Sequence, residues 1–208
     1  MSINQSCYTA SEDIQIQPGA IVGLKYKENS NAVMLEQNTI IRAGTIIYCD
    51  VTCGAYFQTG HNVLIREHTE IGKHVVIGTN TIIDGNVIIG SYVKIESNCY
   101  IPTHTLIGSR VFIGPGVTMT NDKYPLKMRD NYKPQGPTIE DEVTIGGGAV
   151  IVPGIKIGKG SFIAAGTVVT KDIPPMSLVI GFPGKITNLP DELKERNMAL
   201  SWREYLPA

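Results

Sequence analysis

Isoleucine recurs at every sixth position through the middle of the chain. Nine successive positions follow this spacing, namely Ile65, Ile71, Ile77, Ile83, Ile89, Ile95, Ile101, Ile107 and Ile113. The spacing resumes at Ile139, Ile145, Ile151, Ile157, Ile163 and Val169, and it extends back more loosely through Thr59, Cys53, Ile47, Ile41 and Leu35. Residues six apart lie on opposite faces of an α-helix, so these side chains could not share one core there. The pattern instead predicts repeated short strands separated by bends.

The positions around each isoleucine support the same interpretation. The residue after it is often glycine, as at Gly72, Gly78, Gly90, Gly108, Gly114, Gly146 and Gly158. Glycine tolerates the backbone conformations that tight bends require. Three hexads would close a triangular coil of about 18 residues, and parallel pairing would stack coils about 4.8 Å apart. We predict an all-β parallel β-helix of about seven to eight coils.

Two segments interrupt the repeat. Met119 holds the slot after Ile113, but the next slot is filled only at Ile139, so residues 120–137 form an extended polar loop bounded by prolines. Such a loop inside a regular solenoid is usually functional. After the last hexads, residues 190–204 are expected to form a C-terminal helix that begins at Pro190. The predicted organisation is a β-helix domain over residues 1–187 and a helical cap over residues 188–208.

Composition agrees with this fold and excludes several functions. The 28 isoleucines against 10 leucines disfavour a helical bundle, because β-branched side chains suit strands. A net charge of −1 gives no general attraction to nucleic acid or to a membrane surface. No membrane span or secretory signal is visible. The four cysteines, Cys7, Cys49, Cys53 and Cys99, form no C-x-x-C motif, so we expect a soluble cytoplasmic protein.

One corner of the predicted coils gathers polar side chains. Residues 18 apart would stack there as the column Asp50, His68, Asn86, His104 and Asp122, flanked by Arg66, Glu67, Asp84, Thr103 and Asn121. Asn62, Asn80 and Asn98 at another corner are explained as turn residues. A solvent-facing turn explains single members of the polar column equally well. The polar column differs in lying directly below the departure of the 120–137 loop.

Acyl transfer is a reaction that such a corner could support. Imidazole titrates near neutrality, so His104 is a candidate proton acceptor. Asp122 could orient His104 or bind an incoming amine, and Asn121 lies beside it. An amine acceptor needs less base catalysis than a hydroxyl, because the departing thiolate can itself take a proton. Positioning would then supply most of the rate.

The repeat resembles the hexapeptide-repeat acyltransferases, and the resemblance covers roughly residues 10–187. It implies a left-handed helix, whereas general rules for crossovers would favour a right-handed one. It also implies acetyl-CoA as co-substrate and a homotrimer with active sites between subunits. In the segment 146–185, Gly147 and Ala165 would offer backbone groups to the pantetheine. Thr170, Lys171 and Lys185 would lie near the nucleotide of coenzyme A, although Phe182 departs from the family pattern.

Two sequence motifs indicate one group of enzymes within this family. The segments QTGHNVLIREHTEIG (58–72) and TNDKYP (120–125) are similar to N-acetyltransferases of nucleotide-linked amino sugars, such as those acting on 3-amino-3,6-dideoxyhexoses carried on thymidine diphosphate. This similarity implies His104, Asn121 and Asp122 as catalytic residues. The substrate-binding residues would be His68, Asn86, Thr103 and Tyr124. The loop carries a net charge of +2, from Lys123, Lys127, Arg129 and Lys133 against Asp122 and Asp130, which suits a pyrophosphate.

The same repeat is compatible with other functions. A sugar O-acetyltransferase would have the same fold. A γ-class carbonic anhydrase shares the repeat and binds zinc through three histidines, but His68 and His74 fall on different corners and could converge only across subunits. We therefore expect no metal. A purely structural β-helix would bind no acyl-CoA. Cys49 lies beside the polar column, but no positive surroundings favour a covalent route.

Overall fold

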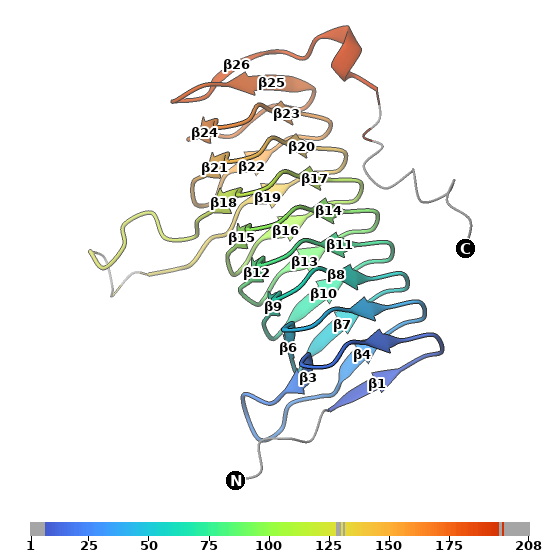
Figure 1. Ribbon diagram of the computed structural model, residues 1–208. Helices are drawn as coiled ribbons and strands as arrows, with labels where there is room; N and C mark the ends of the chain where they lie inside the picture. Colours follow the sequence, from blue (N-terminus) through green and yellow to red (C-terminus); the bar gives the residue numbers. More distant parts are fainter. Residues whose placement is uncertain (1–6, 128–129, 131, 196, 198–208) are drawn as a thin grey trace.

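The computed structural model describes residues 7–127, 130, 132–195 and 197, and it consists of three sheets wound around one axis (Figure 1). Sheet A contains β1 (Tyr8–Ala10), β4 (Val33–Leu35), β7 (Val51–Cys53), β10 (Thr69–Ile71), β13 (Ile88–Ile89), β16 (Leu106–Ile107), β19 (Thr138–Ile139) and β22 (Lys156–Ile157). Sheet B contains β2 (Gln15–Ile16), β5 (Ile40–Ile41), β8 (Gln58–Thr59), β11 (Val76–Ile77), β14 (Lys94–Ile95), β17 (Phe112–Ile113), β20 (Thr144–Ile145), β23 (Phe162–Ile163), β25 (Ser177–Ile180) and β26 (Lys185–Asn188). Sheet C contains β3 (Ile21–Leu24), β6 (Ile46–Tyr48), β9 (Leu64–Ile65), β12 (Ile82–Ile83), β15 (Tyr100–Ile101), β18 (Thr118–Met119), β21 (Val150–Ile151) and β24 (Val168–Val169).

Each strand from β1 to β21 pairs in parallel with the strand one coil further along the chain. Ile83 of β12, for example, faces Ile101 of β15, which fills the inward slot three hexads later. Three strands make one coil, so β1 to β24 form eight coils. The predicted all-β, left-handed parallel β-helix is confirmed. We name its corners by the sheets they join in chain order: A–B, B–C and C–A.

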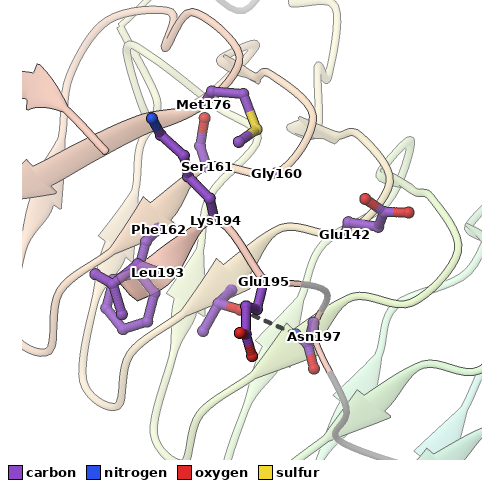
Figure 2. Close-up of a pocket in the computed structure, with 10 residues that line it drawn as sticks. Glu142, Gly160, Ser161, Phe162, Met176, Leu193, Lys194, Glu195 and Asn197 are labelled. Carbon is purple, nitrogen blue, oxygen red and sulfur yellow. Dashed lines mark hydrogen bonds between the residues drawn. The ribbon is translucent and has the colours of Figure 1, made fainter. Parts of the chain in front are cut away.

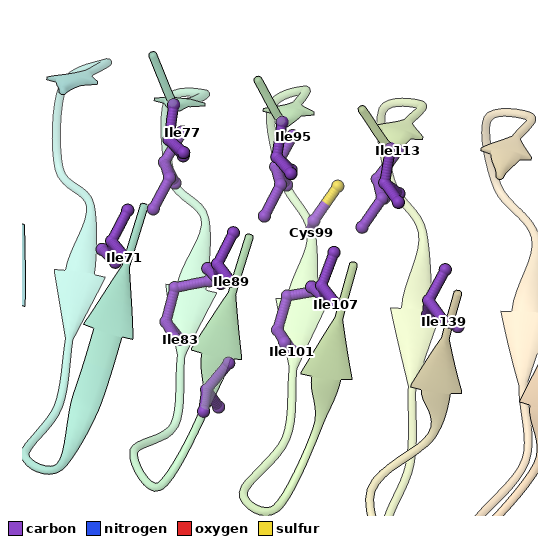
Figure 3. Close-up of a cluster of buried hydrophobic side chains, with 14 of the residues drawn as sticks. Ile71, Ile77, Ile83, Ile89, Ile95, Cys99, Ile101, Ile107, Ile113 and Ile139 are labelled. Atoms are coloured by element: carbon purple, nitrogen blue, oxygen red, sulfur yellow. The ribbon is translucent and has the colours of Figure 1, made fainter. Parts of the chain in front are cut away.

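The inward slots of the repeat form the core. Isoleucines from successive coils lie above one another in continuous rows (Figure 3). The nine isoleucines of the first block are at most 4% exposed. Glycine follows these slots because the coils approach closely. A Cβ on Gly78 would lie 2.5 Å from the backbone nitrogen of Ser97, so a larger residue would force the coils apart.

Side chains also stack along the corners. On the B–C corner, Asn62 donates to Asn80 and Asn80 donates to Asn98, each at 3.3 Å. On the A–B corner, the His74 ring is stacked between those of Tyr56 and Tyr92, with centroid distances of 4.5 and 4.9 Å. These contacts give each corner side chain a hydrogen-bond or ring partner in the next coil, and they stabilise the stacking of the coils.

The coil is longer than three hexads in two places, both at the C–A corner. Leu106 pairs directly with Thr138, so the longer coil between them accommodates the predicted 120–137 loop, called here the central excursion. Ile21 pairs with Ile46, which makes the first coil longer than the regular ones as well. The extra residues of this first coil lie in segment 25–32, called here the N-terminal excursion. The hexad pattern did not predict it.

The C-terminal end differs from the prediction. β25 and β26 form an antiparallel hairpin that extends sheet B. The helix expected over residues 190–204 does not begin as an α-helix, because Pro190 is extended and only the 3₁₀ turn η2 (Asp191–Leu193) follows. Lys194 and Glu195 are not helical, and residues 196 and 198–208 of that prediction lie outside the described part. None of the described helical segments is long and apolar enough to cross a membrane.

Candidate active site

The predicted polar column lies on the C–A corner. Asp50, His68, Asn86 and His104 occupy the same turn position in successive coils, with φ between 49° and 61°. Asparagine, aspartate and histidine tolerate this left-handed conformation better than most residues. The asparagines of the B–C corner adopt it too, so the turn explains part of the residue choice at both corners. The turn alone therefore does not identify a site, and the feature that distinguishes the C–A corner is the excursion above it.

The base of the central excursion closes over this column. The amide of Gln135 donates to the carbonyl of Asn121 at 3.0 Å, and the amide of Gly154 donates to the carbonyl of Gln135 at 2.9 Å. A Cβ on Gly136 would lie 2.6 Å from the carbonyl carbon of His104, so the returning chain fits there only as glycine. The excursion is therefore fixed to the corner at His104, as the sequence led us to expect.

The register places Gly136 above His104 on the C–A corner, because Leu106 faces Thr138 in sheet A. In sheet C, Tyr100 faces Thr118, which places Asp122 above the same corner from the other side. Asp122 therefore begins the excursion instead of filling the turn. Its Oδ1 accepts a hydrogen bond from the backbone N–H of Tyr124 at 2.9 Å. Among the described residues, no hydrogen bond joins Asp122 to His104.

The remaining predicted residues of this corner lie close in sequence to the excursion. Thr103 directly precedes His104 and is half-buried, while Asn121 and Asp122 are also half-buried. Tyr124 is 52% exposed, and the His104 side chain is exposed. A ligand at the base of the central excursion could therefore reach these side chains.

The N-terminal excursion adds a second group that sequence reasoning missed. The Tyr26 hydroxyl donates to Oδ2 of Asp50 at 2.6 Å, and it lies 3.0 Å from Nε2 of His68. The backbone and side-chain nitrogens of Asn31 donate to Oδ1 of Asp50 at 2.9 and 2.7 Å. We call Tyr26, Asn31, Asp50 and His68 the Tyr26 cluster. The only sequence signal for it was the irregular first coil.

Asp50 is the most strongly held carboxylate of this corner. Its side chain is 6% exposed. The hydrogen bond from Tyr26, followed by those from Asn31 and the charge of Lys27, lowers the pKa of Asp50 from 3.8 to about 2. Each bond stabilises the charged form of the acid. Asp50 therefore stays ionised throughout the physiological range.

Replacing Asp50 with asparagine should lower the free energy of unfolding by about 1.5 to 3 kcal/mol at pH 7, as for hydrogen bonds to a charged group. A carboxyl with a lowered pKa stabilises the fold above its unfolded pKa, and that contribution is lost as the pH falls. The difference between wild type and Asp50→Asn should therefore shrink from about pH 4 to about pH 2 in urea titrations. Exposed Asp13, which has the same turn conformation with φ of 59°, provides the control Asp13→Asn. A difference that does not change with pH would contradict this assignment.

A second charged network lies between His68 and His104. Arg66 binds both carboxylate oxygens of Glu67, at 2.7 and 3.2 Å, and Oδ1 of Asp84 at 3.1 Å. The Tyr100 hydroxyl donates to Oδ2 of Asp84 at 2.9 Å. Burial and then the Asp84 carboxylate raise the pKa of Tyr100 to about 12, so Tyr100 remains a neutral donor. The network fixes its members to one another, which makes Arg66 a structural cation.

The predicted cofactor residues lie on two corners and at the start of the C-terminal strand β26. Gly147 and Ala165 are stacked on the B–C corner, where the amide of Gly166 donates to the carbonyl of Gly147 at 2.9 Å. Thr170 and Lys171 follow β24 on the C–A corner and are exposed. Lys185 begins β26, directly after Gly184, whose amide donates to the carbonyl of Val168 at 2.9 Å.

A strip free of side chains runs beside Gly147 and Ala165. Gly116, Gly148 and Gly166 occupy the turn positions where lower coils carry Asn62, Asn80 and Asn98, and their φ values lie between 67° and 69°. A Cβ at any of these three glycines would meet nothing within 4 Å. The change from asparagine to glycine occurs at the coil from which the central excursion departs. The strip leaves room for a narrow chain such as pantetheine along the upper B–C corner.

The alternative chemistries depend on metal-binding side chains and on Cys49. Among the described residues, no group of three histidine, cysteine or acidic side chains could hold a metal ion. Cys49 is buried and its thiol donates to the carbonyl of Gly23 at 3.3 Å. Burial raises the pKa of this thiol, which disfavours the nucleophilic thiolate.

A small crevice lies under the C-terminal segment, beside sheet B (Figure 2). Its volume is about 30 Å³, and Asn197 spans it by donating to the hydroxyl of Thr144 at 2.9 Å. A space of this size holds about one water molecule. A crevice of this volume is too small for a cofactor, and Leu193, Lys194, Glu195 and Asn197 line one side of it.

Known sequences place the repeat in a family. The family described as "Bacterial transferase hexapeptide (six repeats)" matches residues 86–121 and 136–171. The "Hexapeptide repeat of succinyl-transferase" matches residues 68–102. A hexapeptide-repeat-containing acetyltransferase from Vibrio cholerae is 31% identical over 66% of this chain and 73% of its own, with a TM-score of 0.39. Residues 68–121 and 136–171 of this chain therefore carry hexapeptide repeats of the transferase type.

One further relative is similar to the chain in sequence over a short segment, and one solved structure is similar to it in fold. A 2,3,4,5-tetrahydropyridine-2,6-dicarboxylate N-acetyltransferase from Clostridium perfringens is 56% identical over 54 residues, covering 26% of this chain and 23% of that protein. A UDP-N-acetylglucosamine acyltransferase from Bacteroides fragilis is 18% identical, covers 95% of this chain and 78% of its own, and has a TM-score of 0.61. The latter likeness shows the fold alone. The chain spans 23% to 37% of the length of the first curated relatives it matches.

Proposed function

We propose that the protein transfers an acetyl group from acetyl-CoA to the amine of a nucleotide-linked amino sugar, by direct attack in a ternary complex. The observation that carries this proposal is the arrangement around sheet C. A glycine strip suited to pantetheine borders the sheet on the B–C corner, and the polar column with the central excursion borders it on the C–A corner. N-acetyl transfer is also the activity named for the Clostridium perfringens relative.

The role proposed for each site residue follows from its position in the β-helix. Gly147 and Ala165 would bind pantetheine through their backbone, with Thr170, Lys171 and Lys185 toward the nucleotide. His68, Asn86, Thr103 and Tyr124 would bind the sugar. His104 would accept the proton that the amine loses during attack and deliver it to the departing thiolate, while Asn121 and Asp122 position the amine.

We infer that each site is completed by a neighbouring subunit in a homotrimer. Outward side chains of sheet A support an association surface, because Met34, Ile88 and Leu106 are 54%, 48% and 45% exposed. Ile88 and Leu106 lie on the neighbouring strands β13 and β16, and exposed apolar side chains grouped in this way favour burial against a second protein surface. Analytical ultracentrifugation of the full chain distinguishes a trimer from a monomer.

A thiol-release assay with acetyl-CoA tests the function across a panel of dTDP- and UDP-linked amino sugars, with the corresponding hydroxyl sugars as matched controls. We expect thiol release with at least one amino sugar and none with its hydroxyl counterpart. Activity on hydroxyl sugars alone would assign the chain to O-acetylation. No release with any acceptor would contradict acetyl transfer to sugars.

A further inference from the structure

Gln135 is fixed at the proposed acceptor site by contacts of its backbone. Its amide donates to the carbonyl of Asn121 at 3.0 Å, and its carbonyl accepts from the amide of Gly154 at 2.9 Å. The next residue, Gly136, packs against the backbone of His104, because a Cβ at Gly136 would lie 2.6 Å from the carbonyl carbon of His104. Gln135 therefore lies between two of the residues predicted to be catalytic, Asn121 and His104.

The Gln135 side chain lies along the C–A corner, over Gly154. Gly154 is the turn residue of its coil, with φ of 69°, and it occupies the position that His104 occupies two coils below. A Cβ at Gly154 would lie 3.1 Å from Oε1 of Gln135 and 3.9 Å from its Cδ. The carboxamide of Gln135 therefore fills the place in the polar column that this glycine leaves without a side chain.

The proposed amine site lies between His104 and this carboxamide. Strand β15 pairs with β18, and β18 pairs with β21. Asp122 therefore lies one coil above His104, and the carboxamide over Gly154 lies one coil above Asp122. Two coils span about 10 Å along the helix axis, which leaves room for one sugar ring with its polar substituents. A sugar whose amine is held at Asp122 would have His104 on one side and Gln135 on the other.

The chemistry of a carboxamide suits a sugar hydroxyl. The Gln135 side chain is exposed, and within the described residues it makes no hydrogen bond. It offers two N–H donors and a carbonyl acceptor without a charge, so it can both donate to a hydroxyl and accept from it. An ammonium group forms its stronger hydrogen bonds with a carboxylate, which Asp122 provides. The two side chains therefore match two different substituents of an amino sugar.

We propose that the Gln135 carboxamide binds a hydroxyl on a ring carbon next to the one that bears the amine, and that it thereby determines which amino sugars the protein accepts. This inference rests on the proposed function. The hydrogen bond is made in the bound sugar and is retained in the transition state, so it contributes to acceptor affinity and leaves the chemical step unchanged. A sugar without this hydroxyl loses the bond and binds more weakly.

The variant Gln135→Ala removes the carboxamide and keeps both backbone hydrogen bonds. The acceptor is the amino sugar with the highest kcat/KM in the thiol-release panel, compared with analogues that each lack one hydroxyl next to the amine. For the wild type, one analogue should have a KM about five- to tenfold above that of the parent sugar, as for the loss of one neutral hydrogen bond. For Gln135→Ala, the KM of the parent sugar should rise to that of this analogue, with kcat little changed. Calorimetric titration with the same sugars should show the same differences in Kd.

Gln37→Ala is the matched control. The carbonyl of Gln37 likewise accepts from the amide of a turn residue one coil further, Tyr56, at 2.9 Å, but it does so on the A–B corner. This variant should keep the wild-type KM for every acceptor. A second variant, Gln135→Met, keeps the length of the side chain without its hydrogen-bonding groups and should behave like Gln135→Ala.

The proposal is wrong if Gln135→Ala still discriminates between the parent sugar and the analogue as the wild type does. Wild-type KM values that are equal for the parent sugar and all analogues would also contradict it. An equal rise in KM for the parent sugar and every analogue would show that Gln135 supports the excursion and binds no hydroxyl. Failure of the proposed function has a different signature, because the wild type itself would then release no thiol with any amino sugar.

Discussion

Replacing His104 with asparagine is expected to lower kcat for acetyl transfer about 100-fold. Asparagine suits the turn at His104, where φ is 61°, so the backbone should be retained while the imidazole is lost. General base catalysis contributes about 10²- to 10⁴-fold, and the lower end applies here because the departing thiolate assists an amine acceptor. The KM for acetyl-CoA should change little, because the glycine strip is untouched.

Two results separate this effect from misfolding. The control His74→Asn removes an imidazole from the same turn position of a different corner and should keep wild-type turnover. Circular dichroism and the urea midpoint of His104→Asn should match those of the wild type. Turnover within a factor of about three of wild type would exclude an essential base at His104, leaving positioning as the source of the rate.

Replacing Ile89 with alanine is expected to lower the free energy of unfolding by about 2 to 5 kcal/mol. Ile89 is 2% exposed and continues the row formed by Ile71 and Ile107 (Figure 3). The coils above and below constrain the neighbouring backbone, so a cavity there can collapse only partly. The loss is therefore expected to include a cavity contribution as well as the lost burial.

Ile21, on β3 of sheet C, provides a control outside the proposed association surface. It is 42% exposed, so Ile21→Ala should cost less than about 1 kcal/mol. Urea titrations of both variants at one protein concentration measure the difference. Equal losses at the two positions would contradict the assignment of inward and outward faces in the β-helix.

The fold was largely predictable because the repeat determines the core, the spacing of the coils and their register. One isoleucine per hexad fixes the inward slot, the following glycine allows the close approach of coils, and three hexads fix the register between one coil and the next. The first coil was not predicted because its repeat is weak and its greater length hides the N-terminal excursion. The hairpin β25–β26 was missed because its strands leave the hexad period.

The polar column was predictable for the same reason, since equivalent positions of successive coils must stack. Two features were beyond the sequence. Gly136 lies above His104 on the C–A corner, because the excursion returns to the helix at a point that no period marks. Tyr26 reaches His68 from a loop outside the repeat, far away in the sequence. Contacts made by irregular segments depend on the path of the chain and leave no periodic signal.

The central claim is that the acceptor atom is an amine nitrogen. The most direct measurement incubates the protein with acetyl-CoA and an equimolar pair of nucleotide sugars that differ only in an amine or a hydroxyl at one carbon, followed by mass spectrometry and NMR of the products. We predict that only the amino sugar gains one acetyl group and that the acetyl carbonyl couples to an amide proton on that carbon. Acetylation of the hydroxyl sugar, or an ester on the amino sugar with its amine intact, would contradict the account.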